Sequence, residues 1–170
     1  MRRVDLPKGV PGALFLSSMP GRDGPVEEAI REMRESEIDH VICLTPEDEI
    51  RLKSPGYAAV LERSGLPCEV QRFPIVDFGV PEDRDAFVSL VGQLRDRLRE
   101  GRRVLVHCSA GFGRSGMVAT CVLVALGAEA DMAREAVERA GSRPEHDLVG
   151  WMAENGGDGG PRKGERDGES

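Results

Sequence analysis

The strongest indication of the fold is the stretch VLVHCSAGFGRSGMVATCVLVAL, residues 104–126. It opens with an uninterrupted apolar run, continues through a short loop with two glycines, and ends in an apolar segment of helical length. An apolar run without polar alternation is typical of a strand that is covered on both faces of its sheet. A buried strand that leads through a short loop into a helix predicts the α/β class.

The rest of the chain repeats this pattern. Its hydrophobic periodicity predicts strands at 13–16, 40–44, 69–73 and 104–108. It predicts helices at 25–37, 57–64, 117–126, 129–140 and 146–153, and a long helix that begins at 81–83 and ends at Gly101. Gly65 is expected to cap the second helix. We therefore expect one α/β domain with a central, mostly parallel β-sheet flanked by helices.

The loop between the last strand and its helix has the composition of an anion site. Backbone N–H groups at a helix N-terminus have no intrahelical partners and can point at an anion. Arg114 adds a planar fork that matches two phosphate oxygens. Two glycines let the backbone turn and approach the ligand without a Cβ. We expect a phosphate group to be bound by Ser109, Ala110, Gly111, Phe112, Gly113 and Arg114.

Cys108 at the start of this loop is the candidate nucleophile. A thiol attacks phosphorus only as thiolate, and the loop N–H groups, the helix dipole and Arg114 all favour the anionic sulfur. Ser115 could donate a hydrogen bond to that sulfur, and His107 could orient the loop by bonding backbone carbonyls. For Cys108 taken alone, an inert buried cysteine in an ordinary strand-to-helix turn is the alternative interpretation.

Residues 107–115, HCSAGFGRS, fit the pattern H-C-x-x-G-x-x-R-[ST]. This pattern resembles the signature of cysteine-dependent phosphatases, which tyrosine and dual-specificity phosphatases share. Residues 73–81, FPIVDFGVP, are similar to the general-acid loop of small dual-specificity phosphatases, particularly the cyclin-dependent kinase-associated group, and residues 16–21, LSSMPG, resemble its N-terminal part. The resemblance covers residues 10–153. It implies a dual-specificity phosphatase-like fold and hydrolysis of phosphotyrosine and phosphoserine or phosphothreonine on proteins through a cysteinyl-phosphate.

Asp77 is the candidate general acid. The leaving oxygen of a phosphate ester needs a proton, and a carboxylic acid on a loop can supply it. Asp77 lies among prolines and glycine just before a predicted helix. Asp83 and Asp85 are the other candidates, although acidic residues at a helix start also suit the helix dipole.

The second step needs a group that positions water. Many members of the family have a glutamine-containing segment after an Arg-Pro pair, whereas residues 142–147, SRPEHD, have no glutamine. His146 or Asp147 could replace it, or both could simply cap a helix.

Composition limits the other possibilities. The chain has 170 residues, of which 23 are basic and 30 acidic, so its net charge is −7. Its length fits one domain, which we assign to residues 1–154, and the Gly-rich, charged residues 155–170 are predicted to be disordered. An acidic chain is a poor partner for nucleic acid or an anionic membrane. We expect a cytoplasmic monomer without metal or organic cofactor, because Arg114 and the loop dipoles supply the positive charge.

Cys43 is the candidate redox partner of Cys108. It ends the strand at 40–44, which is expected to lie beside the strand at 104–108 with both carboxyl ends at one edge. A shift of one residue would turn Cys43 to the opposite face, and an inert buried cysteine is the alternative. Cys121, within an apolar helix, is predicted to be a core residue.

Other functions share parts of this chemistry. A phosphoinositide phosphatase usually has lysine inside the loop, and the interior at 109–113 has none. An RNA 5′-phosphatase would need a basic approach surface, and a rhodanese-type sulfurtransferase would not need Asp77. A non-enzymatic phosphate-binding module would lack the cysteine, the arginine or the acid. With one Tyr and one Trp, the chain shows no aromatic clamp, which favours a shallow pocket open to several phosphorylated residues.

Overall fold

The structure is a computed structural model that describes residues 1–153. Its centre is a five-stranded sheet with the order β1-β2-β5-β3-β4. The strands are β1 (Arg2–Val4), β2 (Ala13–Ser17), β3 (His40–Cys43), β4 (Glu69–Arg72) and β5 (Arg103–His107). Every neighbouring pair is parallel except β1 and β2. The predicted mostly parallel α/β sheet is confirmed, with an antiparallel edge strand that the charged sequence at 2–4 did not indicate.

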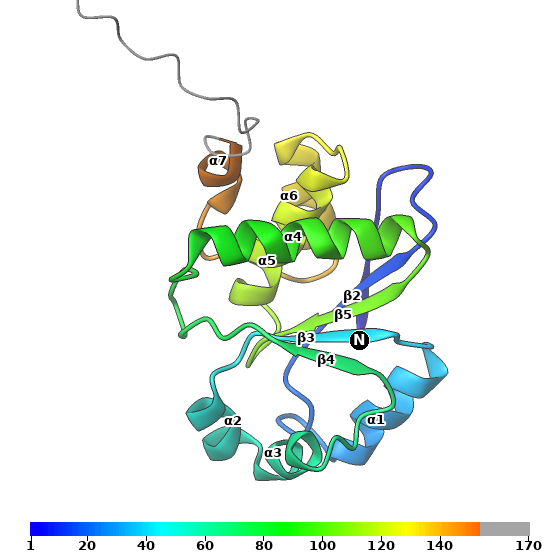
Figure 1. The fold of residues 1–170 in the computed structure, drawn as a ribbon, viewed down its shortest axis with the longest axis vertical. Helices are drawn as coiled ribbons and strands as arrows, with labels where there is room; N and C mark the ends of the chain where they lie inside the picture. Colours follow the sequence, from blue (N-terminus) through cyan, green and yellow to red (C-terminus); the bar gives the residue numbers. More distant parts are fainter. Residues whose placement is uncertain (154–170) are drawn as a thin grey trace, which may run out of the picture.

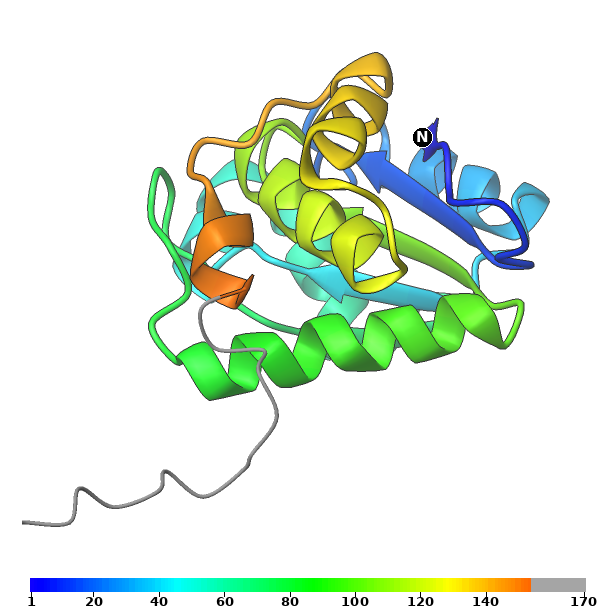
Figure 2. The same cartoon turned by 90° about the horizontal axis from the view of Figure 1, so that it is seen from above.

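Helices cover both faces of this sheet (Figure 1). One face carries α4 (Arg84–Arg99), α5 (Gly113–Ala125), α6 (Ala130–Arg139) and α7 (Leu148–Ala153), which lie above the sheet in Figure 1 and in front of it in Figure 2. The other face carries α1 (Val26–Glu35), α2 (Glu47–Lys53) and α3 (Pro55–Glu62). None of the helices within residues 1–153 has the length and apolar character needed to cross a bilayer. The tail predicted at 155–170 lies outside the described residues.

The region between β3 and β4 differs from the prediction. It holds two helices, α2 and α3, where one was predicted. The helix α2 was missed because its charged sequence buries only Ile50 and so lacks the apolar periodicity that indicates a helix. Gly65 takes part in the cap of α3, as predicted, but it is not the residue in the left-handed conformation. Ser64 adopts that conformation, with φ of 52°, and Gly65 N–H donates to the Val60 carbonyl at 2.8 Å. The chain therefore closes α3 with a serine where glycine is usual.

The position of β5 between β2 and β3 places the loop that follows it. The register pairs His107 at the end of β5 with Ser17 of β2 and with Cys43 of β3. Because these three strands are parallel, their carboxyl ends meet at one edge of the sheet. The loop after β5 leaves from the middle of that edge and enters α5, whose residues 113–123 are all buried. A helix buried on all sides lies within the core, so the loop leads directly into a core element.

Candidate active site

The loop from Cys108 to the start of α5 wraps around the cysteine sulfur. The backbone N–H of Gly111 donates to Cys108 Sγ at 3.2 Å, and the Ser115 hydroxyl lies 3.6 Å from the same sulfur. Gly111 has φ of +75°, and a Cβ there would lie 2.4–2.6 Å from backbone atoms of Ser17 and Ser18. The loop is thus pressed against the end of β2, and only glycine fits at this position.

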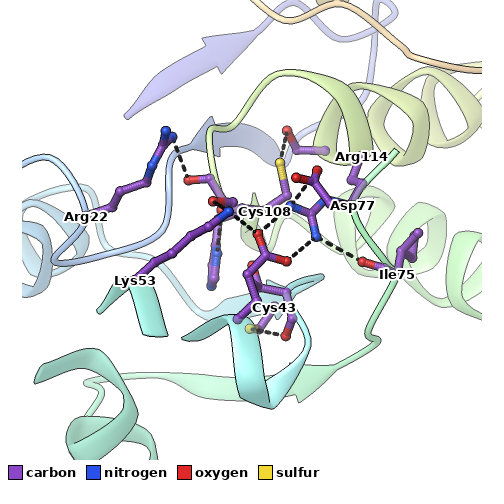
Figure 3. A network of polar contacts seen from close by, with 12 residues as sticks. Arg22, Cys43, Lys53, Ile75, Asp77, Cys108 and Arg114 are labelled. Carbon is purple, nitrogen blue, oxygen red and sulfur yellow. Dashed lines mark hydrogen bonds and ion pairs between the residues drawn. The ribbon is translucent and has the colours of Figure 1, made fainter. Parts of the chain in front are cut away.

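Side chains from distant parts of the chain also hold this loop. Ser142 Oγ donates to the Gly111 carbonyl at 3.2 Å and to the Phe112 carbonyl, and Arg2 Nη2 donates to the Gly111 carbonyl as well. Arg22 Nη1 donates to the Ser109 carbonyl at 3.2 Å, and Lys53 Nζ donates to Ser109 Oγ at 3.1 Å (Figure 3). All of these bonds except that of Lys53 are accepted by backbone carbonyls of the loop, so side chains from distant segments help to fix its backbone.

His107 is fully buried beneath the loop. Its Nε2 lies 2.8 Å from the hydroxyl of Tyr57, and its Nδ1 lies 3.4 Å from the Cys108 carbonyl. Burial lowers the pKa of His107 to about 4, so the imidazole is neutral at pH 7. The contact with the Cys108 carbonyl agrees with the predicted orienting role, whereas the partner Tyr57 was not predicted.

Arg114 is almost completely buried at 2% exposure and stands at the centre of an ion-pair network. Its Nη1 donates to Glu49 Oε2 at 2.8 Å and to the Ile75 carbonyl at 3.0 Å. Its Nη2 donates to Glu49 Oε1 at 3.0 Å and lies 3.1 Å from Asp77 Oδ1. The hydrogen bonds from Arg114, with a smaller contribution from Lys53, hold the pKa of Glu49 at about 2. Sequence reasoning missed Glu49, because one acidic residue in a charged helix has no distinguishing pattern.

Asp77 lies on the exposed loop between β4 and α4, and its carboxylate points toward Arg114 in Figure 3. Its side chain is 46% exposed, so it is the outermost member of the network. The structure gives the other candidates different positions. Asp83 caps α4 by accepting from the Ala86 N–H at 2.9 Å, and Asp85 lies in the first turn of that helix.

The segment at 142–147, which has no glutamine, contacts both the loop after β5, through Ser142, and the loop that carries Asp77, through His146. His146 Nε2 donates to the Phe78 carbonyl at 2.9 Å, next to Asp77. Asp147 instead pairs with Arg134 and accepts from the Val149 N–H at 3.0 Å, so it serves the start of α7. Of these two residues, His146 contacts the loop that carries Asp77, and Asp147 does not.

The redox hypothesis for Cys43 does not fit the structure. Cys43 is opposite His107 in the register and packs with Tyr57, whereas Cys108 belongs to the core on the other face of the sheet. Leu44 fills the position on the face of Cys108, and the Cys43 thiol contacts the Thr45 carbonyl at 3.8 Å. Burial raises the pKa of Cys43. The two thiols point to opposite faces because consecutive strand residues alternate.

Cys121 is a core residue, as predicted: it is 1% exposed, and burial raises its pKa to about 12.

Comparison with known proteins agrees with this geometry. The family model described as Swiss Army Knife protein, DSP-PTPase phosphatase domain, matches residues 10–149. Cyclin-dependent kinase inhibitor 3 of Rattus norvegicus is 26% identical over 102 residues, which are 59% of this chain and 47% of that protein. Tyrosine-protein phosphatase Lar of Drosophila melanogaster is 34% identical over 68 residues, 36% of this chain and 3% of that protein. The chain thus spans less than half the length of the curated relatives it matches.

A solved structure of kinase associated phosphatase, with its catalytic-site cysteine replaced by serine, has a TM-score of 0.75 at 20% identity. The alignment covers 92% of this chain and 96% of that one. Tk-PTP in its active form has a TM-score of 0.61 at 27% identity, with 84% and 88% of the two chains covered. The likeness to kinase associated phosphatase shows that the two proteins share a fold.

Proposed function

Since this chain belongs to the DSP-PTPase phosphatase domain family, we propose that its domain, residues 1–154, hydrolyses phosphate monoesters on proteins through a cysteinyl-phosphate. One observation carries the proposal: the thiol of Cys108, the guanidinium of Arg114 and the carboxylate of Asp77 converge on one loop. Gly111 N–H reaches the sulfur at 3.2 Å, and Arg114 reaches Asp77 at 3.1 Å. This arrangement supplies a nucleophile, a phosphate fork and a proton donor.

In the first step, the Cys108 thiolate attacks phosphorus, a P–S bond forms and the P–O bond to the leaving group breaks. Asp77, in its protonated form, gives its proton to the leaving oxygen. The loop N–H groups and Arg114 stabilise the negative charge on the equatorial oxygens.

Arg114 has five N–H donors, and four of them face Glu49, Ile75 and Asp77. A phosphate that engages Nη2 therefore displaces a carboxylate. Glu49 is bidentate and its side chain is only 12% exposed, so the exposed Asp77 is the partner released toward the leaving group.

In the second step, water attacks phosphorus, the P–S bond breaks and Asp77 takes a proton from that water. Ser115, whose hydroxyl lies 3.6 Å from Sγ, stabilises the departing thiolate. His146 supports this step by holding the carbonyl next to Asp77.

The four cysteines are free, which supports action in a reducing compartment such as the cytoplasm.

The direct test uses Cys108→Ser and an aryl phosphate. The variant should lose hydrolysis completely while its circular dichroism spectrum and its binding of inorganic phosphate remain. Arg114→Lys should also be severely impaired, because a point charge cannot replace the fork. Substantial turnover by Cys108→Ser would contradict covalent catalysis.

Hydrolysis of phosphoinositides is the second candidate, and one observation favours it. The loop interior lacks lysine, but Lys53 from α2 reaches Ser109 Oγ at 3.1 Å and so brings an ammonium group to the loop. One neighbour, PTPMT1, was solved in complex with PI(5)P, with a TM-score of 0.60 at 20% identity. A panel of phosphopeptides and inositol phosphates separates the two candidates, and a clear preference for inositol phosphates would replace protein as the substrate.

A further inference from the structure

A second positively charged site lies beside the phosphate-binding loop. A hollow of about 410 Å³ is lined by Arg2, Ser18, Arg22, Asp23, Ala110 and Phe112. Ala110 and Phe112 belong to the loop itself and flank Gly111, whose N–H donates to the Cys108 sulfur. The hollow and the candidate nucleophile therefore share one loop, so a single substrate can reach both.

The two arginines keep donors free for a ligand. Arg22 uses Nη1 for the Ser109 carbonyl, and its Nε lies 4.0 Å from Asp23 Oδ1. Arg2 uses its Nη atoms for the Gly111 and Gly141 carbonyls and lies over the Phe112 ring, 5.2 Å from the centroid. Each guanidinium has five N–H donors, so several remain on each side chain after these bonds.

The charge balance of the hollow favours an anion, although the chain as a whole has a net charge of −7. Among residues 1–153, Asp23 is the only acidic residue that lines it, and its side chain is 66% exposed and well solvated. An ion pair between such exposed groups is weak. A carboxylate or phosphate that binds both arginines would therefore contribute more binding free energy than is lost when Arg22 gives up its contact with Asp23.

We propose that this hollow is a second anion subsite, which selects phosphopeptides that carry a carboxylate or a second phosphate next to the scissile phosphate. The inference rests on the proposed function and adds a substrate preference to it. A peptide fits better than a membrane headgroup, because the subsite is one local group of cations on an acidic protein and not a broad basic face. The exposed Phe112 ring offers the adjoining peptide side chain an apolar contact.

The test compares kcat/KM for phosphotyrosine peptides of one sequence, flanked by glutamate, by glutamine or by a second phosphorylated residue. The full-length protein should prefer the glutamate peptide over the glutamine peptide by about tenfold, the lower end for hydrogen bonds to charged groups. The doubly phosphorylated peptide should be preferred at least as strongly. Arg22→Gln should reduce both preferences to near one. Arg22 also contacts the loop, but a change in the loop would alter kcat/KM for all the peptides alike, and the ratio between two peptides cancels it.

Two control variants sharpen this test. Arg31→Gln removes an exposed arginine of α1 that pairs with Glu35, so it should keep the wild-type ratio. Asp23→Asn removes the acidic residue of the hollow and should raise the preference for acidic peptides.

Equal hydrolysis of the glutamate and glutamine peptides, or an unchanged ratio in Arg22→Gln, would overturn the subsite. A preference for soluble inositol phosphates or for phosphoinositide vesicles over the acidic peptide would overturn its assignment to peptides. No turnover of any phosphopeptide would instead contradict the proposed function. These three failures are therefore distinguishable in one set of assays.

Discussion

The proposed phosphate-binding loop (residues 108–114) and the proposed acid loop (residues 73–83, which carry Asp77) meet at Arg114 but are built differently. Cys108, Ser109 and Arg114 are buried, and the loop between them is held by β2, α5 and Ser142. The acid loop has fewer buried residues: Ile75 near its start is 1% exposed and its N–H donates to the Leu44 carbonyl at 2.9 Å, and Pro81 is buried near its end. Between these two residues its large apolar side chains are exposed, at 54% for Val76, 75% for Phe78 and 44% for Val80.

This contrast separates two tasks. A group that binds phosphate must hold its donors in place, and a buried loop on a core helix does so. A group that delivers a proton must approach the leaving oxygen, and a loop with few buried contacts can move. Damage to the first loop should therefore abolish activity, and damage to the second should reduce the rate by an amount that depends on the leaving group.

The largest effect is expected for Gly111→Ala. A Cβ at this position meets backbone atoms of Ser17 and Ser18 at 2.4–2.6 Å in a left-handed conformation. We expect about 10⁴-fold lower kcat/KM, because a lost transition-state donor costs ~10²–10³ and a misplaced nucleophile about another 10². Steady-state kinetics and thermal unfolding measure this change.

Gly113→Ala is the matched control. There the three atoms nearest to the added Cβ all belong to the side chain of Glu145, which is exposed and can move away. Its loss of activity should be far smaller, and similar losses in both variants would mean that the loop has no special requirement at Gly111.

Asp77→Asn comes next. The amide cannot donate the proton, so kcat should fall by about 10²–10³-fold for alkyl or poor aryl leaving groups, within the range of general acid catalysis. The loss should be much smaller for a very good leaving group, and the basic limb of the pH–rate profile should flatten. A profile identical to wild type would transfer the acid role to another residue.

Glu49→Gln tests what holds the fork in the buried loop. The Glu49 carboxyl has a pKa of about 2 in the fold, against an ordinary value of 4.5, so the unfolded chain binds more protons between these values. The contribution of Glu49 is therefore complete above about pH 5 and is lost as pH falls toward 2. At pH 7 the free energy of unfolding of the variant should be about 1–3 kcal/mol lower than that of the wild type. Denaturant titrations should show the difference from wild type shrinking below pH 4.5, and a constant difference would contradict the pairing.

The smallest effect is expected for His146→Ala. It removes one exposed hydrogen bond to the Phe78 carbonyl, worth about 1 kcal/mol, so kcat should fall by about fivefold for poor leaving groups. Asp147→Asn, which affects Arg134 and the start of α7, should leave this rate unchanged. Equal effects in the two variants would remove His146 from the support of the acid loop.

Much of the architecture could be predicted because it is encoded locally. The apolar face of α4 follows helical spacing, and Phe87, Leu90, Val91, Leu94 and Leu98 are all buried. The apolar runs of β3 and β5 likewise predicted strands covered on both faces. The exceptions are short or charged elements, β1 and α2, whose place depends on pairing and packing and not on their own periodicity.

The proposed phosphate-binding loop could be predicted because its residues are neighbours in the chain and their spacing alone brings cysteine, glycine and arginine together. The residues that surround that loop could not be predicted, because they come from distant parts of the chain. Glu49 lies 65 positions from Arg114, and Tyr57 lies 50 positions from His107. No local pattern marks such partners. The register of β3 against β5 brought them to one edge of the sheet, and the same register turned Cys43 away from Cys108.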